Sequence, residues 1–325
     1  REQVSLHVIG AVLTFANRRI ALIGNGGQAQ RIKAALRIRE LDPDCIYKPR
    51  LRKGDNGITD DFENVRECGI IFLCSPNNTH FDYLTSLIGD RYIFCEKPPV
   101  QTQDQIDSLR ELDNGKIHYN FNLRYSELSK FLIKSREYGF GELISASITT
   151  SHGLATKQDY HKSWRADSSL CPKGIFEIVS IHAIDLVGYH FDIANIDSNK
   201  LSNRSGIGNS YDTANTTIVL ANSGRVEVFS TYVAPCFDHW IFVFENGLLI
   251  ADPTGITLRG PRDVFDTRGF FILPPIIEKQ SISFVEDHVQ SIERSVAFFL
   301  DTTMRNSNFD PKISELSMFS NSLIV

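Results

Sequence analysis

The sequence predicts two domains of the α/β class. Residues 1–121 are expected to form a doubly wound parallel sheet with its helices, and residues 122–325 an α+β domain on an open, mainly antiparallel sheet. A length of 325 residues suits two domains. The first two-fifths of the chain alternates short apolar runs with helical patterns, as βαβ units do. Beyond Asn122, runs rich in β-branched and aromatic residues indicate strands with one buried face.

Apolar runs mark the expected strands of the first domain. They occupy residues 19–24, 45–47, 69–74, 91–95 and 116–121. Runs without polar interruptions, such as residues 19–24, are typical of strands buried on both faces. Apolar residues at helical spacing predict helices at 28–40, 79–88 and 102–112 between these runs.

The second domain is expected to contain longer, alternating strands. These lie at residues 143–151, 213–220, 225–232 and 240–244. Helical patterns cover residues 126–138, 174–191 and 284–300. Long strands and long connections together favour an open, mainly antiparallel sheet.

Composition excludes several classes of protein. A net charge of -5 gives no reason to expect nucleic acid or an anionic membrane as a partner. The six cysteines include no Cys-x-x-Cys pair, which is typical of reduced thiols in a cytosolic protein. No metal site is expected, because the histidines lack ligand spacing. The apolar segment Val4–Phe15 is too short to span a bilayer and is expected to pack on the domain as a helix or strand, with a cleaved signal peptide as the alternative.

A glycine-rich turn follows the first expected strand and begins the first expected helix. Its residues are Gly24, Asn25, Gly26, Gly27, Gln28 and Ala29. Gly24 permits a tight turn, Gly26 lets the backbone approach a pyrophosphate, and Ala29 is small enough for close helix–strand packing. Phosphates would lie at the helix N-terminus, where free N–H groups favour anions. The turn therefore predicts a Rossmann dinucleotide-binding domain.

The end of the second strand bears on the choice of cofactor. Basic residues follow it, namely Lys48, Arg50, Arg52 and Lys53, and the next acid is Asp55. An acid there would bind the ribose hydroxyls of NAD, whereas arginine accommodates the 2′-phosphate of NADP. NADP is therefore modestly favoured over NAD, with a solvated basic loop as the alternative.

A lysine ends the fourth expected strand, in the sequence Cys95-Glu96-Lys97-Pro98-Pro99. This places an ammonium at the carboxyl edge of the sheet, where open α/β sheets bind their ligands. A lysine in a partly desolvated site loses its proton readily enough for acid–base work. A surface lysine at a strand end is the alternative.

Three motifs in order make the chain resemble the glucose–fructose oxidoreductase / inositol dehydrogenase / MocA family. They are the turn at residues 24–29, the segment from Phe72 to His80 and the tripeptide Glu96-Lys97-Pro98; residues 120–125 also resemble that family's interdomain segment. The resemblance covers essentially the whole chain. It implies oxidoreduction of sugars, cyclitols or sugar-nucleotides, and a homodimer or homotetramer assembled through the second domain.

The resemblance also implies roles for particular residues. Lys97 would contact both the reacting hydroxyl and the cofactor. Further cofactor contacts would come from Ser75, Pro76, Asn78, His80 and Glu96.

The resemblance further implies an acid–base histidine on a helix of the second domain, with an aspartate four residues before it. His182 matches the histidine, but Ile178 stands in place of the acid and Glu177 falls one position earlier. One residue rotates an α-helix by about 100°, so Glu177 cannot simply replace that acid on the same face. Either the helix begins differently, or the chain works without this acid. Asp185, one turn after His182, either orients its ring or is structural.

Other candidates for substrate binding precede that helix. Trp164 and Arg165 join an aromatic face to a guanidinium, which suits a sugar ring bearing a phosphate or carboxylate; a surface ion pair is the alternative. Arg124 and Tyr160 are weaker candidates.

The expected reaction is reversible hydride transfer between a secondary alcohol carbon and nicotinamide. His182 or Lys97 would take the hydroxyl proton while the other steadies the alkoxide. Two alternatives stay open: an NAD-dependent glycosidase acting by transient oxidation, and a cofactor-binding sensor without catalysis.

Overall fold

The computed structural model describes residues 18–52 and 54–325. The expected leading segment Val4–Phe15 and the loop residue Lys53 lie outside the described residues. The chain divides into two compact units. Unit 1 contains the described residues up to Phe121 together with residues 292–323 and Val325, and unit 2 contains residues 122–291 and Ile324. No helix in the described parts is both long and apolar enough to cross a bilayer.

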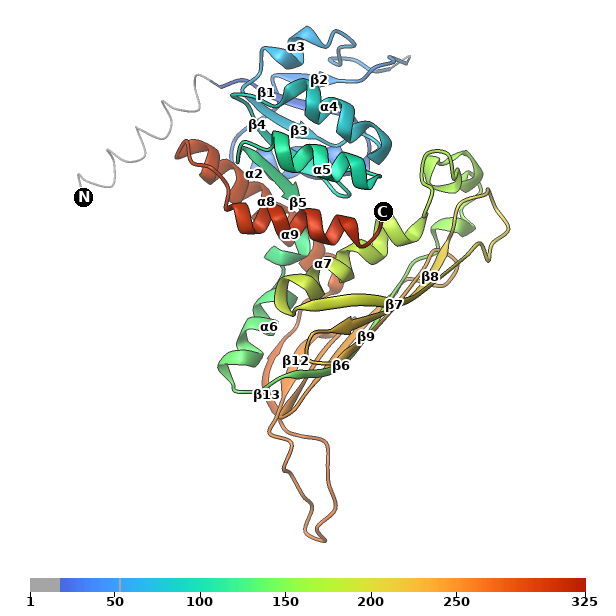
Figure 1. Ribbon diagram of the computed structural model, residues 1–325, viewed down its shortest axis with the longest axis vertical. Helices are drawn as coiled ribbons and strands as arrows, with labels where there is room; N and C mark the ends of the chain where they lie inside the picture. The colour runs from blue at the N-terminus through green and yellow to red at the C-terminus, as the bar shows by residue number, and fades with distance from the viewer. Residues whose placement is uncertain (1–17, 53) are drawn as a thin grey trace, which may run out of the picture. The chain divides into compact units, whose positions relative to one another are not determined.

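Unit 1 is built on a parallel sheet of five strands in the order β2-β1-β3-β4-β5 (Figure 1). The strands are β1 (Ile20–Ile23), β2 (Cys45–Tyr47), β3 (Ile70–Leu73), β4 (Tyr92–Glu96) and β5 (Ile117–Asn120). Every residue of β1, β3, β4 and β5 is buried. Uninterrupted apolar runs form these strands because neither face of the sheet meets water. The expected doubly wound fold is confirmed.

The helices of unit 1 supply the cover for this sheet. They are α2 (Gly27–Ile38), α3 (Glu63–Arg66), the 3₁₀ turn η1 (Asn77–Thr79), α4 (His80–Leu87) and α5 (Gln103–Leu112). Ile32 and Leu36 of α2 are fully buried in a core that also contains Leu22 and Phe72 of the strands. The sequence did not predict α3, because its four residues are too few to show a helical period.

The C-terminal helices belong largely to unit 1, although residues 122–325 were expected to form one domain. They are α8 (Phe284–Met304), divided between the units at residue 292, and α9 (Pro311–Ser322). Phe299 of α8 lies 5.2 Å from Phe72 and 5.4 Å from Phe94, ring centre to ring centre. Apolar packing against the parallel sheet thus decides where this segment belongs.

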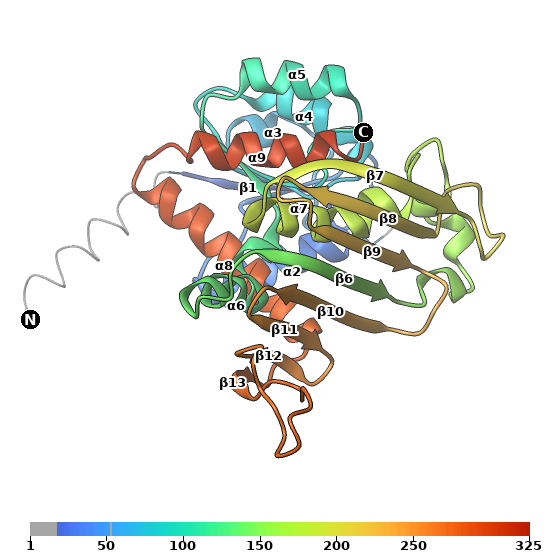
Figure 2. The ribbon, with the colours of Figure 1, turned by 60° about the horizontal axis from the view of Figure 1, so that its bottom comes forward.

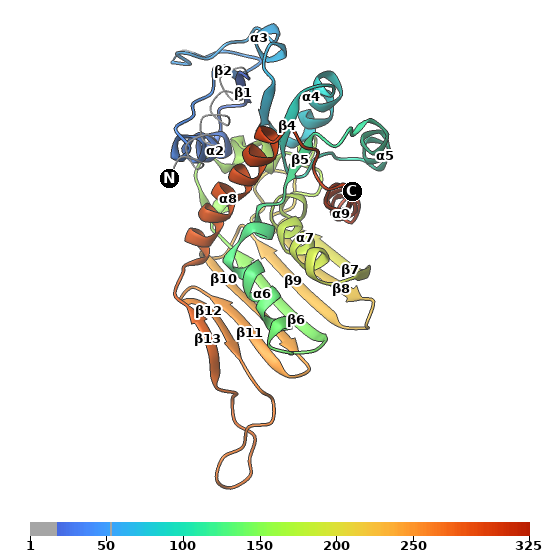
Figure 3. The same cartoon turned by 90° about the vertical axis from the view of Figure 1, so that its left-hand side faces the viewer.

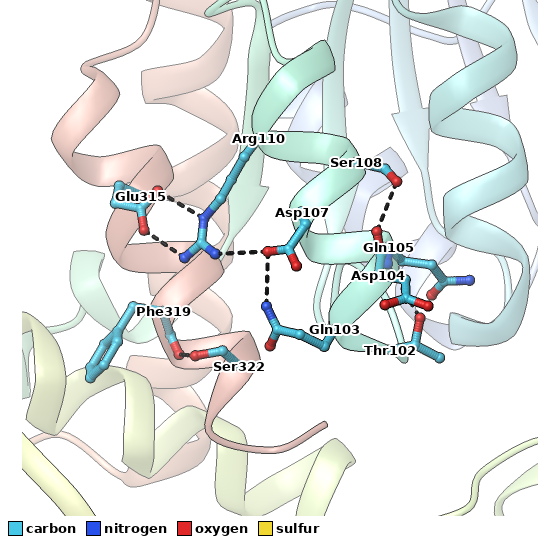
Figure 4. A network of polar contacts seen from close by, with 10 residues as sticks. All are labelled: Thr102, Gln103, Asp104, Gln105, Asp107, Ser108, Arg110, Glu315, Phe319 and Ser322. Atoms are coloured by element: carbon cyan, nitrogen blue, oxygen red, sulfur yellow. Dashed lines mark hydrogen bonds and ion pairs between the residues drawn. The ribbon is translucent and has the colours of Figure 1, made fainter.

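Polar contacts also hold α9 within unit 1. Arg110 of α5 bonds both carboxylate oxygens of Glu315 on α9, at 2.6 and 3.2 Å, and also meets Asp107 (Figure 4). The sequence did not predict α9. Its buried residues include Ser317, Ser320 and Asn321, so it lacks a clear apolar stripe.

Unit 2 is built on a sheet of eight strands in the order β13-β12-β11-β10-β6-β9-β8-β7 (Figure 2). The strands are β6 (Leu143–Ser151), β7 (Ile193–Ser202), β8 (Thr213–Leu220), β9 (Arg225–Thr231), β10 (Phe237–Phe244), β11 (Gly247–Asp252), β12 (Gly255–Arg259) and β13 (Ile276–Gln280). All neighbours are antiparallel except β6 and β9, which run parallel. The expected α+β unit is confirmed.

Helices lie along one face of the eight-stranded sheet (Figure 3). They are α6 (Glu127–Glu137) and α7 (Ile181–His190), with the first part of α8 following the last strand. Short turns complete the unit: η2 (Asn122–Tyr125), η3 (Leu154–Thr156), η4 (Tyr160–Lys162), η5 (Trp164–Ala166) and the π-helix η6 (Phe176–Ser180). One-sided cover gives β9 its alternation, in which Val226 and Val228 are buried while Glu227 and Phe229 are exposed.

Four strands of this sheet were not predicted. The strands β7 and β13 form its two edges, and each contains several exposed or partly exposed residues. Edge strands need fewer apolar residues, so their hydrophobic pattern is weak. The strands β11 and β12 are short hairpin strands of six and five residues.

Candidate functional site

The glycine turn adopts the geometry that its sequence predicts. Gly24 has φ +103°, and a Cβ there would lie 2.7 Å from the carbonyl oxygen of Cys74. Only glycine fits this position, because both the backbone conformation and the close approach exclude a side chain. Gly26 is the N-cap of α2, and Ala29 is fully buried where the helix meets the sheet.

Open space faces the N-terminus of α2. A Cβ built at Gly26 or Gly27 meets no atom within 4 Å, and no acidic residue lies in the first turn of the helix. The free N–H groups of that turn and the helix dipole favour an anion here. Asn25, Gly26 and Gly27 are exposed to solvent. These residues fit a dinucleotide pyrophosphate.

A second feature of the same sheet edge supports this fit. Asn77, which follows β3, is 6% exposed, and its amide Nδ2 has no hydrogen-bond partner among the described residues. A buried amide donor without a partner is costly, and a ligand oxygen would satisfy it. The sequence analysis did not select Asn77. Its place after a buried strand, beside the selected Ser75, Pro76 and Asn78, was the available signal.

Glu96 is held inside unit 1 by amide donors. Its Oε1 accepts hydrogen bonds from Gln28 at 2.8 Å and from Asn120 at 2.7 Å. Burial raises the pKa of Glu96, while these two hydrogen bonds oppose the rise. Asn120 accepts in turn from Ser295 at 2.8 Å. The side chains of Gln28 and Glu96 therefore join the glycine turn to the end of β4.

His80 links two backbone segments of unit 1. The ring is fully buried, with Nδ1 2.9 Å from the carbonyl oxygen of Pro98 and Nε2 2.9 Å from that of Ser75. Both ring nitrogens thus face backbone carbonyl oxygens. His80 ties the segment after β3 to the segment after β4, and its expected contact with the cofactor stays a prediction.

Lys97 lies at the carboxyl edge of the parallel sheet. It follows Glu96, the last residue of β4, and a cis peptide bond joins it to Pro98. Its side chain is partly buried, while Pro98 and Pro99 are buried. Lys97, Gly24 and Asn77 therefore all follow the carboxyl ends of adjacent parallel strands.

The basic loop after β2 is partly neutralised by an acid. Lys48 Nζ lies 2.8 Å from Asp55 Oδ2, and the backbone N–H of Arg52 donates to the same oxygen at 2.6 Å. The hydrogen bond from Lys48 lowers the pKa of Asp55. Arg50 and Arg52 are exposed and form no ion pair among the described residues. Arg50 thus stays available, whereas Lys48 is already paired.

In unit 2, the π-helix changes the register that the sequence analysis assumed. The N–H of Ile181 donates to the carbonyl of Phe176, five residues earlier, where an α-helix would join residues four apart. This wider turn brings residues five apart onto one face, so Glu177 aligns with His182. Of the two alternatives left open by the sequence, the structure shows that the helix begins differently.

Glu177 is buried at 4% exposure, and its Oε1 accepts a hydrogen bond from the backbone N–H of Lys173 at 3.0 Å. His182 is partly exposed, and its ring centre lies 5.8 Å from that of His288, nearly perpendicular to it. The sequence analysis did not select His288, because nothing local marks it. Its place on the first turns of α8 depends on the tertiary fold.

Asp185 has a partner other than His182. Its carboxylate binds the guanidinium of Arg124 through both oxygens, with Nε–Oδ2 at 2.9 Å and Nη2–Oδ1 at 2.5 Å. Both side chains are almost wholly buried, at 3% and 1% exposure. A buried, bidentate pair of this kind holds η2 against α7. Arg124 and Asp185 are therefore structural partners, and the expected contact of Arg124 with substrate stays a prediction.

Trp164 and Arg165 stack on one another as their adjacency suggested. The guanidinium carbon of Arg165 lies 4.4 Å from the Trp164 ring centre, and both side chains are partly exposed. The expected alternative, a surface ion pair, is absent: within residues 18–52 and 54–325, Arg165 has no carboxylate partner.

Comparison with known proteins gives a partial sequence likeness and an extensive structural one. No protein-family model matches the chain. D-glucoside 3-dehydrogenase of Escherichia coli (strain K12) is 27% identical over 135 residues, which cover 36% of this chain and 38% of that protein. The chain thus matches well under half of this curated relative.

Solved structures share the fold along nearly the whole chain. Levoglucosan dehydrogenase in complex with NADH and levoglucosan has a TM-score of 0.77 at 16% identity, over 95% of this chain and 96% of its own. A myo-inositol dehydrogenase from Corynebacterium glutamicum ATCC 13032 has a TM-score of 0.71 at 20% identity, over 95% and 94%. The predicted fold class is confirmed.

Proposed function

We propose that this chain, which has the fold of the glucose–fructose oxidoreductase / inositol dehydrogenase / MocA family, is an NAD(P)-dependent oxidoreductase. The proposed reaction transfers a hydride between nicotinamide and a secondary alcohol or ketone of a sugar, cyclitol or sugar-nucleotide. The observation that carries the proposal is the glycine turn, where open space and free N–H groups face the N-terminus of α2. Likeness to named sugar and cyclitol dehydrogenases supports it.

The residues of unit 1 would bind and orient the dinucleotide. The backbone of Gly24–Ala29 would hold the pyrophosphate, and Asn77 Nδ2 would donate to a ligand oxygen. When bound, the cofactor supplies a nicotinamide ring that accepts or delivers a hydride. Glu96, fixed by Gln28 and Asn120, would hold the backbone from which Lys97 extends.

Proton transfer is assigned to Lys97 and His182. As the hydride leaves the alcohol carbon, one of the two takes the hydroxyl proton and the other stabilises the developing alkoxide. Glu177, aligned with His182 by the π-turn, would fix the orientation of the histidine or bind a substrate hydroxyl. The electron pair moves to the cofactor with the hydride, so the reaction needs no further oxidant.

The finer choice of cofactor rests on the loop after β2. NADP is modestly favoured, because Arg50 and Arg52 are exposed cations without ion pairs in the described part of the chain and suit a 2′-phosphate. Lys48 contributes less than its sequence position suggests, since it is paired with Asp55. Asp55 would itself suit the ribose hydroxyls of NAD.

Fluorescence titration with NADPH and NADH tests the cofactor site directly. We expect tight binding of NADPH and weaker binding of NADH, because only NADPH carries the 2′-phosphate that Arg50 and Arg52 would bind. The reverse preference would keep the site and reject the role of Arg50. Binding of neither by folded protein would overturn the proposed function.

A matched variant makes this test specific to the turn. Gly26 has φ -81°, which alanine adopts freely, and its Cβ would enter open space. Gly26→Ala should therefore fold normally, while the added methyl group obstructs the pyrophosphate and weakens binding of the dinucleotide. Equal binding by wild type and variant would contradict the assigned position of the phosphates.

A homo-oligomer is also proposed, assembled through the uncovered face of the eight-stranded sheet. Phe229 and the β10 residue Phe237 are exposed at 36% and 44%. Apolar patches left uncovered in this way often mark interfaces. Light scattering during gel filtration should give twice or four times the chain mass, and a monomeric mass would reject this proposal.

A further inference from the structure

The parallel pair β6 and β9 brings two side chains together at the end of the sheet in unit 2. Ser151 and Thr231, the last residues of these strands, are register partners, so His152 and Tyr232 both follow the same edge. The N–H of His152 donates to the carbonyl of Thr231 at 3.1 Å. The two rings lie 4.8 Å apart, centre to centre, at an angle of 37°. An antiparallel pairing would have sent these residues to opposite ends.

The hydroxyl of Tyr232 has no partner within the described residues. Its side chain is 1% exposed, and no hydrogen bond to the hydroxyl oxygen is formed. Burial raises the pKa of Tyr232, so the hydroxyl keeps its proton and can donate. A buried hydroxyl without a partner is costly and suggests that a ligand satisfies it.

Arg165 supplies an uncompensated positive charge beside this pair, because its turn η5 contacts η4, whose Tyr160 ring centre lies 6.2 Å from that of Tyr232. Its guanidinium is stacked on Trp164 at 4.4 Å and forms no side-chain hydrogen bond or ion pair in the described part of the chain. Burial, and after it the charge of Arg165, lowers the pKa of His152. His152 is therefore neutral near pH 7, and Arg165 remains the partly buried cation there.

Glu177 acts electrostatically on Tyr232, and Asp212 acts on the neighbouring Tyr160; both carboxylates already accept backbone hydrogen bonds. Asp212 accepts from the N–H groups of Arg204 and Ser205 at 2.8 Å each. Glu177 accepts from Lys173 at 3.0 Å. Neither forms an ion pair with Arg165. A half-buried guanidinium that is left without an acid suits an incoming anion.

We propose that Arg165, His152 and Tyr232 form a subsite for an anionic group, a carboxylate or a phosphate, carried by the sugar substrate. This proposal rests on the proposed function, because it defines which sugars the enzyme accepts. Arg165 provides the charge, while Tyr232 and His152 donate hydrogen bonds.

Calorimetry on the protein saturated with reduced cofactor tests the subsite, because reduced cofactor cannot take a hydride from the sugar. The probes are D-glucuronate, D-glucose 6-phosphate and, as the neutral control, D-glucose. At least one anionic probe should bind about tenfold or more tightly than D-glucose. Preference for D-glucuronate identifies a carboxylate, and preference for D-glucose 6-phosphate identifies a phosphate.

Variants assign this preference to the cluster. Arg165→Leu should reduce the affinity for the anionic probe to that for D-glucose. Lys162→Ala is the matched control, because Lys162 lies nearby on an exposed turn and is paired with Asp159. It should leave the preference intact.

Tyr232→Phe tests whether the hydroxyl binds the ligand, because a purely structural hydroxyl would not affect the affinity for the anionic probe. Removal of a buried, unpartnered hydroxyl should preserve or raise the melting temperature. In the same variant, the affinity for the anionic probe should fall several-fold.

The outcomes separate this inference from the proposed function. Equal binding of all three sugars, no binding of any, or an unchanged preference in Arg165→Leu would overturn the subsite. Cofactor binding is titrated on the same samples. If the protein binds cofactor but fails these tests, only the proposed subsite is rejected. If the protein binds no cofactor, the proposed function is rejected as well.

Discussion

The two sheets of this protein bury their residues differently. In unit 1, every residue of β1 and β3 is buried, because helices cover both faces of a parallel sheet. In unit 2, helices line one face, and a strand such as β9 alternates between exposed and buried residues. The first arrangement leaves a continuous apolar signal in the sequence. The second arrangement leaves a weaker, alternating hydrophobic pattern, which is hardest to recognise in the edge strands of the sheet.

The same contrast extends to the groups proposed to bind ligands. Unit 1 would hold phosphates with backbone N–H groups, whose positions follow from a short glycine motif. Unit 2 offers side chains from separate segments, such as His152 and Tyr232, which only strand pairing brings together. Motifs thus reveal backbone sites, whereas sites assembled from distant side chains require the fold.

The largest expected effect tests this difference in burial. Phe299→Ala should lower the free energy of unfolding by about 3 to 5 kcal/mol, because the ring is fully buried against Phe72 and Phe94. Ile133→Ala, at a site on α6 of unit 2 that is 42% exposed, should change the stability by less than about 0.5 kcal/mol. Urea unfolding measures both, and similar losses would contradict the contrast.

The next effect concerns chemistry at the edge of the parallel sheet. Lys97→Ala should retain cofactor binding but lose at least about a hundredfold in turnover, the scale of a missing acid–base group. Steady-state kinetics with an accepted sugar would measure the loss. Lys279→Ala on the edge strand β13 is the control and should leave turnover unchanged. Near-normal turnover of Lys97→Ala would reject its catalytic role.

Two Gly→Ala substitutions distinguish the stability cost of backbone strain from the added cost of a steric clash. Gly24→Ala should cost about 2 to 3 kcal/mol, because it combines φ +103° with a backbone oxygen 2.7 Å from the new Cβ. Gly139→Ala in unit 2 has φ +70° but meets no atom within 4 Å, so it should cost only about 1 kcal/mol. Thermal unfolding compares them, and equal losses would mean that the contact at Gly24 relaxes freely.

The smallest effect compares the pH dependence of two acids, the buried Glu96 and the partly buried Asp238. Burial raises the pKa of both, but Glu96 has two amide donors, whereas Asp238 Oδ1 has no partner among the described residues. Burial raises the pKa of Asp238 to about 6. The folded protein thus keeps a proton that the unfolded chain releases near pH 4, and stability falls as the pH rises from about 4 to about 6.

Asp238→Asn should remove this penalty. The variant is expected to be more stable than wild type by about 1 to 2 kcal/mol at pH 8, where the wild-type carboxylate is charged, and equally stable near pH 4. Urea unfolding at the two pH values measures the difference. A gain that is the same at both would show that ionisation of Asp238 is not its cause.

Much of unit 1 could be predicted because its signals are local. The glycine turn, the apolar strands and the position of Lys97 after a strand each lie within a few consecutive residues. The role of His80 could not be predicted, because the carbonyl groups that hold it come from Ser75 and Pro98, on segments after two different strands. The pairing of Lys48 with Asp55 likewise depends on how the loop closes.

The site of unit 2 shows why local pattern was insufficient there. Spacing placed Glu177 off the face of His182, because an α-helix was assumed; a single π-turn reversed that conclusion. Asp185 lies one α-helical turn after His182, yet its carboxylate binds Arg124, far away in the sequence.

The sequence by itself determined the fold class, the glycine turn and the strands of unit 1, because apolar periodicity and glycine conformations are properties of short segments. Only the tertiary structure decided the membership of residues 292–323, the register of Glu177 and the meeting of His152 with Tyr232. These features depend on which distant surfaces bury one another and on which strands pair. The free energy of that packing is shared between segments, so no single segment encodes it.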